Sequence, residues 1–150
     1  MPKQSAGILL YRKVDSQLQV FLVHPGGPFW KNKDEGSWSV PKGEYEDDEE
    51  PLDAARREFY EETGHYIVGD FRALLPVKQK SGKIIHAWAV EGDIDQHQIK
   101  SNLFEMEWPP KSGKKQSFAE VDRGDWFTIE QAKIKMNVAQ VALLEELVRC

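Results

Sequence analysis

The segment from residue 43 to residue 64 restricts the fold and the chemistry of this chain more than any other part of the sequence. Ten acidic side chains lie between Glu44 and Glu62, against two arginines, so the segment carries a net charge of −8. The whole chain carries −5, which leaves +3 for the remaining residues. Such a concentration of negative charge repels phosphate groups unless a bound cation neutralises it.

The same segment has the start and stop signals of one amphipathic helix. Pro51 can open a helix, because the missing N–H of proline costs nothing in the first turn. Leu52, Ala55 and Phe59 fall on one helical stripe, and Gly64 is a typical stop signal. We therefore expect a helix that begins at Pro51, packs its apolar stripe on a core and ends at Gly64.

Three glutamates share one face of that expected helix. Glu58, Glu61 and Glu62 are spaced i, i+3 and i+4, which places them side by side next to the apolar stripe. One interpretation is a braced, solvated face, because Asp53, Arg57 and Glu61 follow one another at i+4 steps. The other is a metal site, because clustered carboxylates suit Mg²⁺ or Mn²⁺ shared with substrate phosphates. The spacing alone leaves both interpretations open.

A longer pattern of fixed residues surrounds these glutamates. It has the order G-x5-E-x7-R-E-x-x-E-E-x-G, and its members are Gly43, Glu49, Arg57, Glu58, Glu61, Glu62 and Gly64. The pattern resembles the Nudix box, the signature of the Nudix hydrolase family, with one departure at His65, where the family usually has an aliphatic residue. The resemblance implies an α+β fold, an α/β/α sandwich with a mixed sheet in which the box forms a loop–helix–loop.

The resemblance also implies roles for the residues of the box. The metal-facing groups would be the carbonyl of Gly43 and the carboxylates of Glu58, Glu61 and Glu62. Arg57 and Glu49 would be structural supports that orient the glutamates and the loop. The implied cofactor is Mg²⁺, for which Mn²⁺ can substitute.

The general base that takes a proton from the attacking water is left open. The catalytic candidates are Glu58, Glu61 and Glu120. Glu120 lies six residues before a strand tryptophan, an offset that resembles the dinucleoside polyphosphate hydrolases, and it would also be a metal ligand. A solvated loop acid is an equal interpretation of Glu120, and Glu105 and Glu107 are weaker competitors for its role.

The stretch before the box carries the substrate prediction. Residues 38–43, Trp-Ser-Val-Pro-Lys-Gly, resemble the lead-in of dinucleoside polyphosphate and diphosphoinositol polyphosphate hydrolases. Lys42 would then meet a phosphate as a point charge. Further candidate substrate contacts are Lys80, Lys83 and His86, each of which alone also fits a plain surface or core residue. The rings of Phe29, Trp30 and Trp38 could stack on a purine, although Trp38 at a strand start also fits a packing residue.

These residues predict a Mg²⁺-dependent pyrophosphohydrolase that cleaves a phosphoanhydride in a nucleoside diphosphate linked to another moiety. Dinucleoside polyphosphates are the preferred substrates. One alternative is a nucleoside triphosphate pyrophosphatase, which product analysis separates from the first prediction. Another is a non-catalytic nucleotide sensor of the same fold, because fold alone does not determine function.

The rest of the chain predicts a single domain, residues 1–150, of strands, one helix, further strands and terminal helices. Strands are expected at residues 5–12, 18–24, 38–40, 71–78 and 83–91, with a loop at residues 25–36. A capping box at residues 128–131 and a helix at about residues 137–149 complete the expected elements.

Composition narrows the expected compartment and partners. The chain has no apolar run of membrane-spanning length, and its first residues have no signal-peptide core, so we expect a cytoplasmic protein. The single cysteine, Cys150, cannot form an internal disulfide and agrees with a reducing compartment. Without a basic face, the expected partner is a small nucleotide or polyphosphate rather than a nucleic-acid duplex or a membrane. The sequence leaves the oligomeric state open.

Overall fold

A computed structural model describes residues 3–149, so Cys150 lies outside the described residues. The strands are β1 (Gln4–Val14), β2 (Gln17–Pro25), β3 (Lys42–Glu44), β4 (Arg72–Ala73), β5 (Val77–Lys78), β6 (Ile84–Glu91), β7 (Leu103–Glu107), β8 (Lys115–Ala119) and β9 (Val121–Thr128). The α-helices are α1 (Pro51–Thr63), α2 (Ile129–Lys135) and α3 (Val141–Val148), with short 3-10 helices η1 (Gln96–Gln98) and η2 (Val138–Gln140). In this part of the chain no helix is long and apolar enough to cross a membrane.

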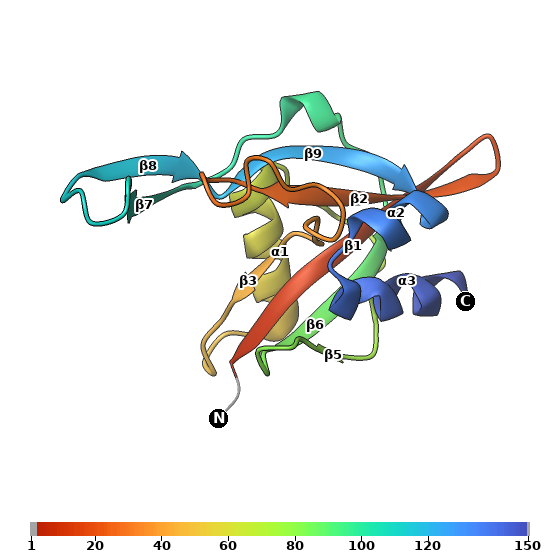
Figure 1. Ribbon diagram of the computed structural model, residues 1–150. Coiled ribbons are helices and arrows are strands. Elements are labelled where there is room, and N and C mark those ends of the chain that lie inside the picture. Colours follow the sequence, from red (N-terminus) through yellow and green to blue (C-terminus); the bar gives the residue numbers. More distant parts are fainter. Residues whose placement is uncertain (1–2, 150) are drawn as a thin grey trace.

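A mixed sheet forms the centre of the molecule. Its strand order is β4-β6-β1-β2-β9, with β3 added to β1 and β5 added to β6. Strands β1 and β6 run parallel, and the other strand pairs of the sheet are antiparallel. β7 and β8 form a separate two-stranded hairpin that projects beyond the main sheet (Figure 1).

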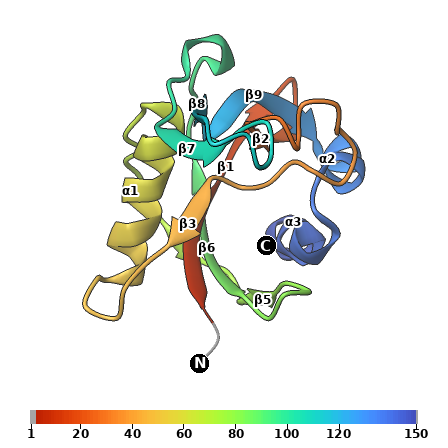
Figure 2. The ribbon, with the colours of Figure 1, turned by 60° about the vertical axis from the view of Figure 1, so that its left-hand side comes forward.

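Helices cover both faces of the sheet, which confirms the expected α/β/α sandwich (Figure 2). The alternation of side chains along β1 makes this arrangement possible, because Leu9 points to one face while Ile8 and Leu10 point to the other. Ile8 and Leu10 pack in a core with Ala55 and Phe59 of α1. Leu9 packs in a second core, which contains buried residues of α2 and α3.

One edge of β1 is divided between two partner strands. Residues 5–7 of β1 pair with β3, and residues 11–14 pair with β2. Between these two stretches the backbone N–H of Ile8 donates to the carbonyl of Pro41 (3.2 Å), and Ser39 exchanges two backbone hydrogen bonds with Val23 (2.9 and 3.0 Å). β2 and β3 therefore separate from each other along this edge of β1. We refer to the place where they separate as the fork, and it forms one wall of the pocket described below.

The expected elements that depend on strong local signals are confirmed. Strands β1, β2 and β6 occupy the predicted positions to within about two residues, and α1 begins at Pro51 and ends at the left-handed Gly64 (φ 79°). Thr128 and Gln131 form the predicted reciprocal capping box at the start of α2. The loop predicted at residues 25–36 is confirmed except at Pro25, which is the last residue of β2.

Other expectations need correction. The prediction of a single strand over residues 71–78 is wrong. β4 and β5 pair separately with β6 on either side of Pro76, which has no N–H to donate. Residues 38–40 form only isolated bridges, Val23↔Ser39 and Trp38↔Met136, rather than a strand. The C-terminal helix is divided into η2 and α3, and the β7–β8 hairpin was not expected.

Candidate active site

Helix α1 places two of its glutamates at the edge of the core. Ala54, Ala55 and Phe59 are fully buried against the sheet and fix which face of α1 points inward. Glu58 and Glu62 lie next to this stripe on the helix, so the edge of the core covers them. Only 7% of Glu58 and 9% of Glu62 is exposed. The structure thus buries two carboxylates of the box that a solvated face would leave in water.

Arg57 connects the loop before α1 to the glutamates of the helix. Its guanidinium donates two hydrogen bonds to Glu49 (2.8 and 2.9 Å), one to Glu58 (2.8 Å) and one to Glu61 (3.1 Å). The hydrogen bonds from Arg57 lower the pKa of Glu49, and the hydrogen bonds to Glu49 are the largest cause of a raised Arg57 pKa. Asp53 takes part in no ion pair within residues 3–149, so the bracing runs through Glu49 instead of Asp53.

Strand β3 brings Gly43 against the carboxylate of Glu58. A Cβ atom on Gly43 would lie 2.0 Å from Oε2 of Glu58, a distance that real atoms do not tolerate. The absence of a side chain at Gly43 is therefore what allows the Glu58 carboxylate to lie against the backbone of β3.

The fourth glutamate, Glu120, reaches the same region from the junction of β8 and β9. Its backbone carbonyl accepts from the N–H of Gly26 (2.8 Å), and its own N–H donates to the carbonyl of Asn102 (2.9 Å). Asn102 in turn donates its N–H to the carbonyl of Glu61 (2.8 Å). These backbone bonds fix Glu120 relative to the end of α1, whereas the weaker candidates Glu105 and Glu107 lie exposed on β7.

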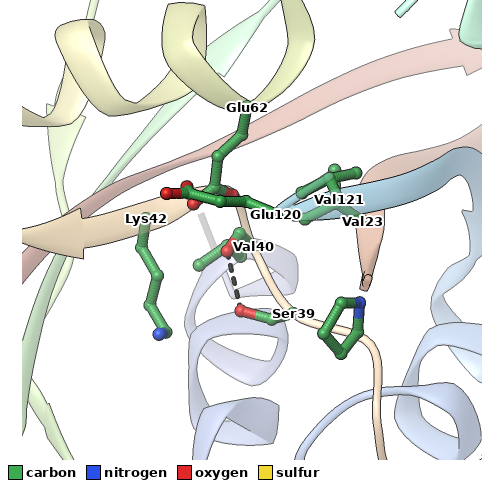
Figure 3. A pocket seen from close by; sticks show the side chains of 8 residues that line it. Val23, Ser39, Val40, Lys42, Glu62, Glu120 and Val121 are labelled. Carbon is green, nitrogen blue, oxygen red and sulfur yellow. Dashed lines mark hydrogen bonds between the residues drawn. The ribbon is translucent and has the colours of Figure 1, made fainter. Parts of the chain in front are cut away.

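Glu62 and Glu120 border an open pocket of about 350 Å³. Figure 3 shows the carboxylates of Glu62 and Glu120 with Lys42 beside them, its amino group pointing away from the carboxylates. The remaining lining residues come from β2, the fork and β9, and they are Val23, Pro25, Ser39, Val40 and Val121. The pocket thus has one charged wall and one mainly apolar wall, which suits a ligand with both phosphate and ring components.

Burial and mutual repulsion raise the pKa values of the carboxyl groups at this site above their usual range. Burial raises the pKa of Glu58 to about 7, and repulsion from Glu61 adds to the rise. Burial also raises the pKa of Glu62 well above its usual value, and Lys42 opposes that rise. Burial lowers the pKa of Lys42, while the nearby charge of Glu62 opposes the decrease.

Glu120 shares in the same repulsion. Burial raises its pKa, and the charge of Glu61 contributes. Glu120 in turn contributes to the raised pKa values of both Glu58 and Glu62. The pKa values of Glu58, Glu62 and Glu120 are therefore raised first by burial and then by the repulsion between neighbouring carboxylates.

The donor chemistry of this cluster fits a divalent cation. Carboxylate and carbonyl oxygens are the ligands preferred by Mg²⁺ and Mn²⁺, and a bound cation would remove the repulsion. In the rotamers of residues 3–149, no three His, Cys, Asp or Glu side chains already converge as a complete ligand set. Glu58 and Glu61 instead direct oxygens to Arg57, so binding would require these side chains to reorient.

The predicted substrate contacts divide into two groups. Lys42 lines the pocket, and Lys83 is close enough to it to influence its pKa, although Lys83 also donates to Glu44 (3.2 Å). The structure does not bring the other two to the carboxylates. Lys80 is exposed in the turn between β5 and β6, and His86 hydrogen-bonds with Gln4 (2.7 Å).

The apolar wall of the pocket was not expected from the sequence. Val23 and Val121 are ordinary strand residues and Pro25 is an ordinary loop residue, so no local signal marks them as pocket residues. Their common position follows from the pairing of β2 with β9, where Pro25 lies opposite Val121.

The fold and the carboxylate-bearing helix define the class to which the chain belongs. A family model described as the NUDIX domain matches residues 1–147. The chain belongs to the NUDIX domain family, which confirms the resemblance drawn from the box.

Among curated relatives, the RNA pyrophosphohydrolase of Bartonella henselae is 36% identical over 62% of this chain and 57% of its own length. The RNA pyrophosphohydrolase of Bartonella bacilliformis is 67% identical over 18% of this chain and 16% of its own length. The chain thus aligns with little more than half of the first relative and with a short part of the second.

Solved structures show the same fold. The C. elegans Ap4A hydrolase in a binary complex matches with a TM-score of 0.67 at 19% identity, covering 98% of this chain and 96% of that chain. The NUDIX domain of Shewanella oneidensis NrtR, complexed with ADP ribose, matches with a TM-score of 0.69 at 17% identity. The match covers 99% of this chain and 88% of that chain. At these identities the similarity concerns the fold.

Proposed function

We propose that this protein is a divalent-metal-dependent pyrophosphohydrolase that cleaves a phosphoanhydride in a nucleoside 5′-polyphosphate. The observation that carries the proposal is a cluster of four glutamates from α1 and the β8–β9 junction, two of which, Glu62 and Glu120, line a pocket bordered by Lys42. A pure binding module has no chemical need for this excess of carboxylates beside a phosphate-binding lysine. The similarity to RNA pyrophosphohydrolases supports the same reaction class.

The proposed metal ligands are the carbonyl of Gly43 and the carboxylates of Glu58, Glu61, Glu62 and Glu120. Mg²⁺, or Mn²⁺ in its place, would neutralise the bridging phosphates and polarise the attacking water. Arg57 and Glu49 act as positioning residues, because their hydrogen bonds restrain the carboxylates of the helix.

Glu120 is the first candidate for the general base. Its carboxylate lines the pocket and has no hydrogen-bond partner within the described part of the chain, so it is free to accept the proton of the attacking water. Glu58 and Glu61 are the other two candidates, but each already accepts a hydrogen bond from Arg57. The attack breaks the bond between phosphorus and the bridging oxygen, and the released phosphate carries the negative charge away.

For the substrate we propose a dinucleoside polyphosphate. Lys42 and Lys83 would contact its phosphate chain, with Lys80 and His86 available only to a longer chain that extends past the pocket. A second candidate is an RNA with a 5′-triphosphate, which the name of the Bartonella henselae relative favours. Both substrates present the same group, a nucleoside 5′-polyphosphate with a large substituent, whereas a nucleoside triphosphate pyrophosphatase or a nucleotide sensor needs no such substituent.

The decisive experiment compares the wild type with Glu62→Gln on a substrate panel, with and without Mg²⁺. The panel contains diadenosine tetraphosphate, 5′-triphosphorylated RNA, nucleoside triphosphates, ADP-ribose and diphosphoinositol phosphates. We expect Mg²⁺-dependent turnover of one class and a loss of more than about 100-fold in Glu62→Gln, beyond the loss typical of residues that only support a ligand. Asp53→Asn, an exposed acid of the same helix, is the matched control and should retain activity.

Product analysis identifies the reaction. Asymmetric cleavage of diadenosine tetraphosphate yields ATP and AMP, whereas a triphosphate pyrophosphatase yields a monophosphate and pyrophosphate. Near-normal turnover in Glu62→Gln would count against the metal assignment. Tight binding without turnover across the panel would instead favour the sensor.

A further inference from the structure

Five aromatic side chains lie outside both hydrophobic cores, on the loop after β2 and on the β7–β8 hairpin. We refer to Phe29, Trp30, Phe104, Trp108 and Phe118 as the aromatic strip. Phe29 is 60% exposed and Trp30 is 40% exposed. A soluble domain seldom leaves neighbouring large aromatic rings in water unless they serve a binding function.

The two segments of the aromatic strip contact each other although they are far apart in the sequence. Phe29 packs edge to face with Trp108, with ring centroids 5.4 Å apart. Phe104 packs with Phe118 across the hairpin at 6.0 Å, and its ring edge lies over Gly27. The contacts hold the loop against the hairpin and leave most of the Phe29 ring open to a ligand.

The aromatic strip begins where the catalytic pocket ends. Pro25 and Glu120 both line the pocket, and the next residue of the loop, Gly26, donates its N–H to the carbonyl of Glu120. Further along this loop Phe29 packs on Trp108 of the hairpin, which projects from the main sheet in Figure 1. The loop that carries Phe29 and Trp30 therefore begins at the rim of the pocket.

The charges around the aromatic strip match a nucleotide better than an apolar peptide. Lys33 lies over the ring of Trp30, 5.1 Å from its centroid, and Lys31 is exposed in the same loop. The hairpin turn and the start of β8 contribute three more exposed lysines, Lys111, Lys114 and Lys115. Aromatic faces combined with cations are the arrangement that binds bases and phosphates together without requiring a particular base.

We propose that the aromatic strip binds the nucleobase on the far side of the cleaved phosphate chain, so that Phe29 and Trp108 select substrates with a second base. This inference rests on the proposed function, and it deepens it by assigning the part of the protein that reads the substituent. Phe29 provides the stacking face, and Trp108 holds that face in place from the hairpin.

The test uses two ligands that differ by one nucleoside, diadenosine tetraphosphate and adenosine 5′-tetraphosphate. We expect Phe29→Ala to lower kcat/KM for diadenosine tetraphosphate by about tenfold, the size of the effect when base stacking on an aromatic ring is removed. The same variant should cleave adenosine 5′-tetraphosphate at the wild-type rate. Phe29→Tyr should retain the preference for two bases, and Trp108→Ala should lose it.

Tyr66→Ala is the matched control, because Tyr66 is an exposed aromatic residue (68%) that stacks on Tyr60 of α1 and not on a residue of the aromatic strip. It should leave both substrates unchanged. Thermal unfolding of each variant tests whether the loop and hairpin remain folded. Equal losses for both ligands in Phe29→Ala, or no loss for either, would overturn the proposal.

Binding measurements separate this inference from the proposed function. If neither ligand is hydrolysed, calorimetric titration of the same variants with both ligands in Mg²⁺ decides the question. A weaker affinity of Phe29→Ala for diadenosine tetraphosphate alone would support the aromatic strip even though the enzymatic proposal had failed. Equal affinities of the wild type for the two ligands would overturn the aromatic strip even where hydrolysis is observed.

Discussion

Arg57 has four hydrogen bonds to three carboxylates, and this makes it the residue whose chemistry is least replaceable. Its planar guanidinium binds Glu49 with two parallel hydrogen bonds while the remaining donor reaches Glu58 and Glu61. A lysine has a single cationic centre and cannot reproduce this geometry. The residue acts on the reaction through the glutamates that it restrains.

We expect Arg57→Ala and Arg57→Lys both to lower turnover by about 10- to 100-fold, the range found when a support for a metal ligand is removed. Glu49→Gln should have a similar effect, because it removes the other end of the same contact. Steady-state kinetics of Arg57→Ala, Glu49→Gln and the double variant that combines them provide the measurement. Coupling requires that the double variant is little worse than either single one, and additive losses would contradict it.

At the scale of elements, the approach of β3 to α1 decides whether the site can form. β3 has only three residues, yet its pairing with β1 places Gly43 directly against Glu58. The backbone of Gly43 lies outside the left-handed region, so its conformation suits any residue and only the contact with Glu58 forbids a side chain.

Gly43→Ala should therefore displace the Glu58 carboxylate while the sheet remains intact. We expect a loss of about 100-fold in kcat/KM, because a misplacement of about 1 Å at a reacting centre has an effect of this size. The far-UV circular dichroism spectrum should match that of the wild type. Wild-type activity in Gly43→Ala would show that the contact between β3 and α1 is irrelevant to catalysis.

The elements that the sequence predicts well are those with chemical signals at their ends. Pro51, Gly64 and the pair Thr128–Gln131 mark boundaries that depend on neighbouring residues alone, and the structure confirms them. The spacing of the box likewise predicts which glutamates of α1 lie together, since helical geometry fixes it.

Features that depend on distant parts of the chain could not be predicted in this way. The β7–β8 hairpin is an exception, because apolar and acidic side chains alternate from Phe104 to Trp108, a local signal of a half-buried strand that the expected elements left out. The apolar wall of the pocket depends on the pairing of β2 with β9. The hydrogen bond between His86 and Gln4 depends in the same way on the pairing of β6 with β1.

At the scale of the whole molecule, the buried carboxyls link stability to pH. The pKa of Glu58 is about 7 and that of Glu62 is also raised, so the folded protein binds more protons than the unfolded chain from about pH 4.5 upwards. The free energy of unfolding of the metal-free protein should therefore fall as pH rises from about 5 to about 7.5. Glu49, Glu44 and Asp34 have lowered pKa values, so their contributions are lost only below this window.

Thermal unfolding in EDTA across this pH range measures the effect. The midpoint should decrease with pH in the wild type and change less in Glu58→Gln, which cannot ionise at that position. Added Mg²⁺ should restore stability most at the higher pH, where the carboxylates are charged and bind it. A midpoint that rises steadily from pH 5 to 7.5 without metal would contradict the burial of these charges.

At the fork, a loop whose length and sequence can change is attached to a sheet that holds α1 in place. The loop between β2 and β3 is anchored on the sheet at one end by the hydrogen bond of Gly26 to Glu120 and at the other by the paired backbones of Val23 and Ser39. Insertions or deletions between these anchors alter the reach of the loop and leave α1 in place. Exchange of this loop is thus a route by which evolution, or an engineer, can retarget the protein to another substituent while the hydrolytic residues stay unaltered.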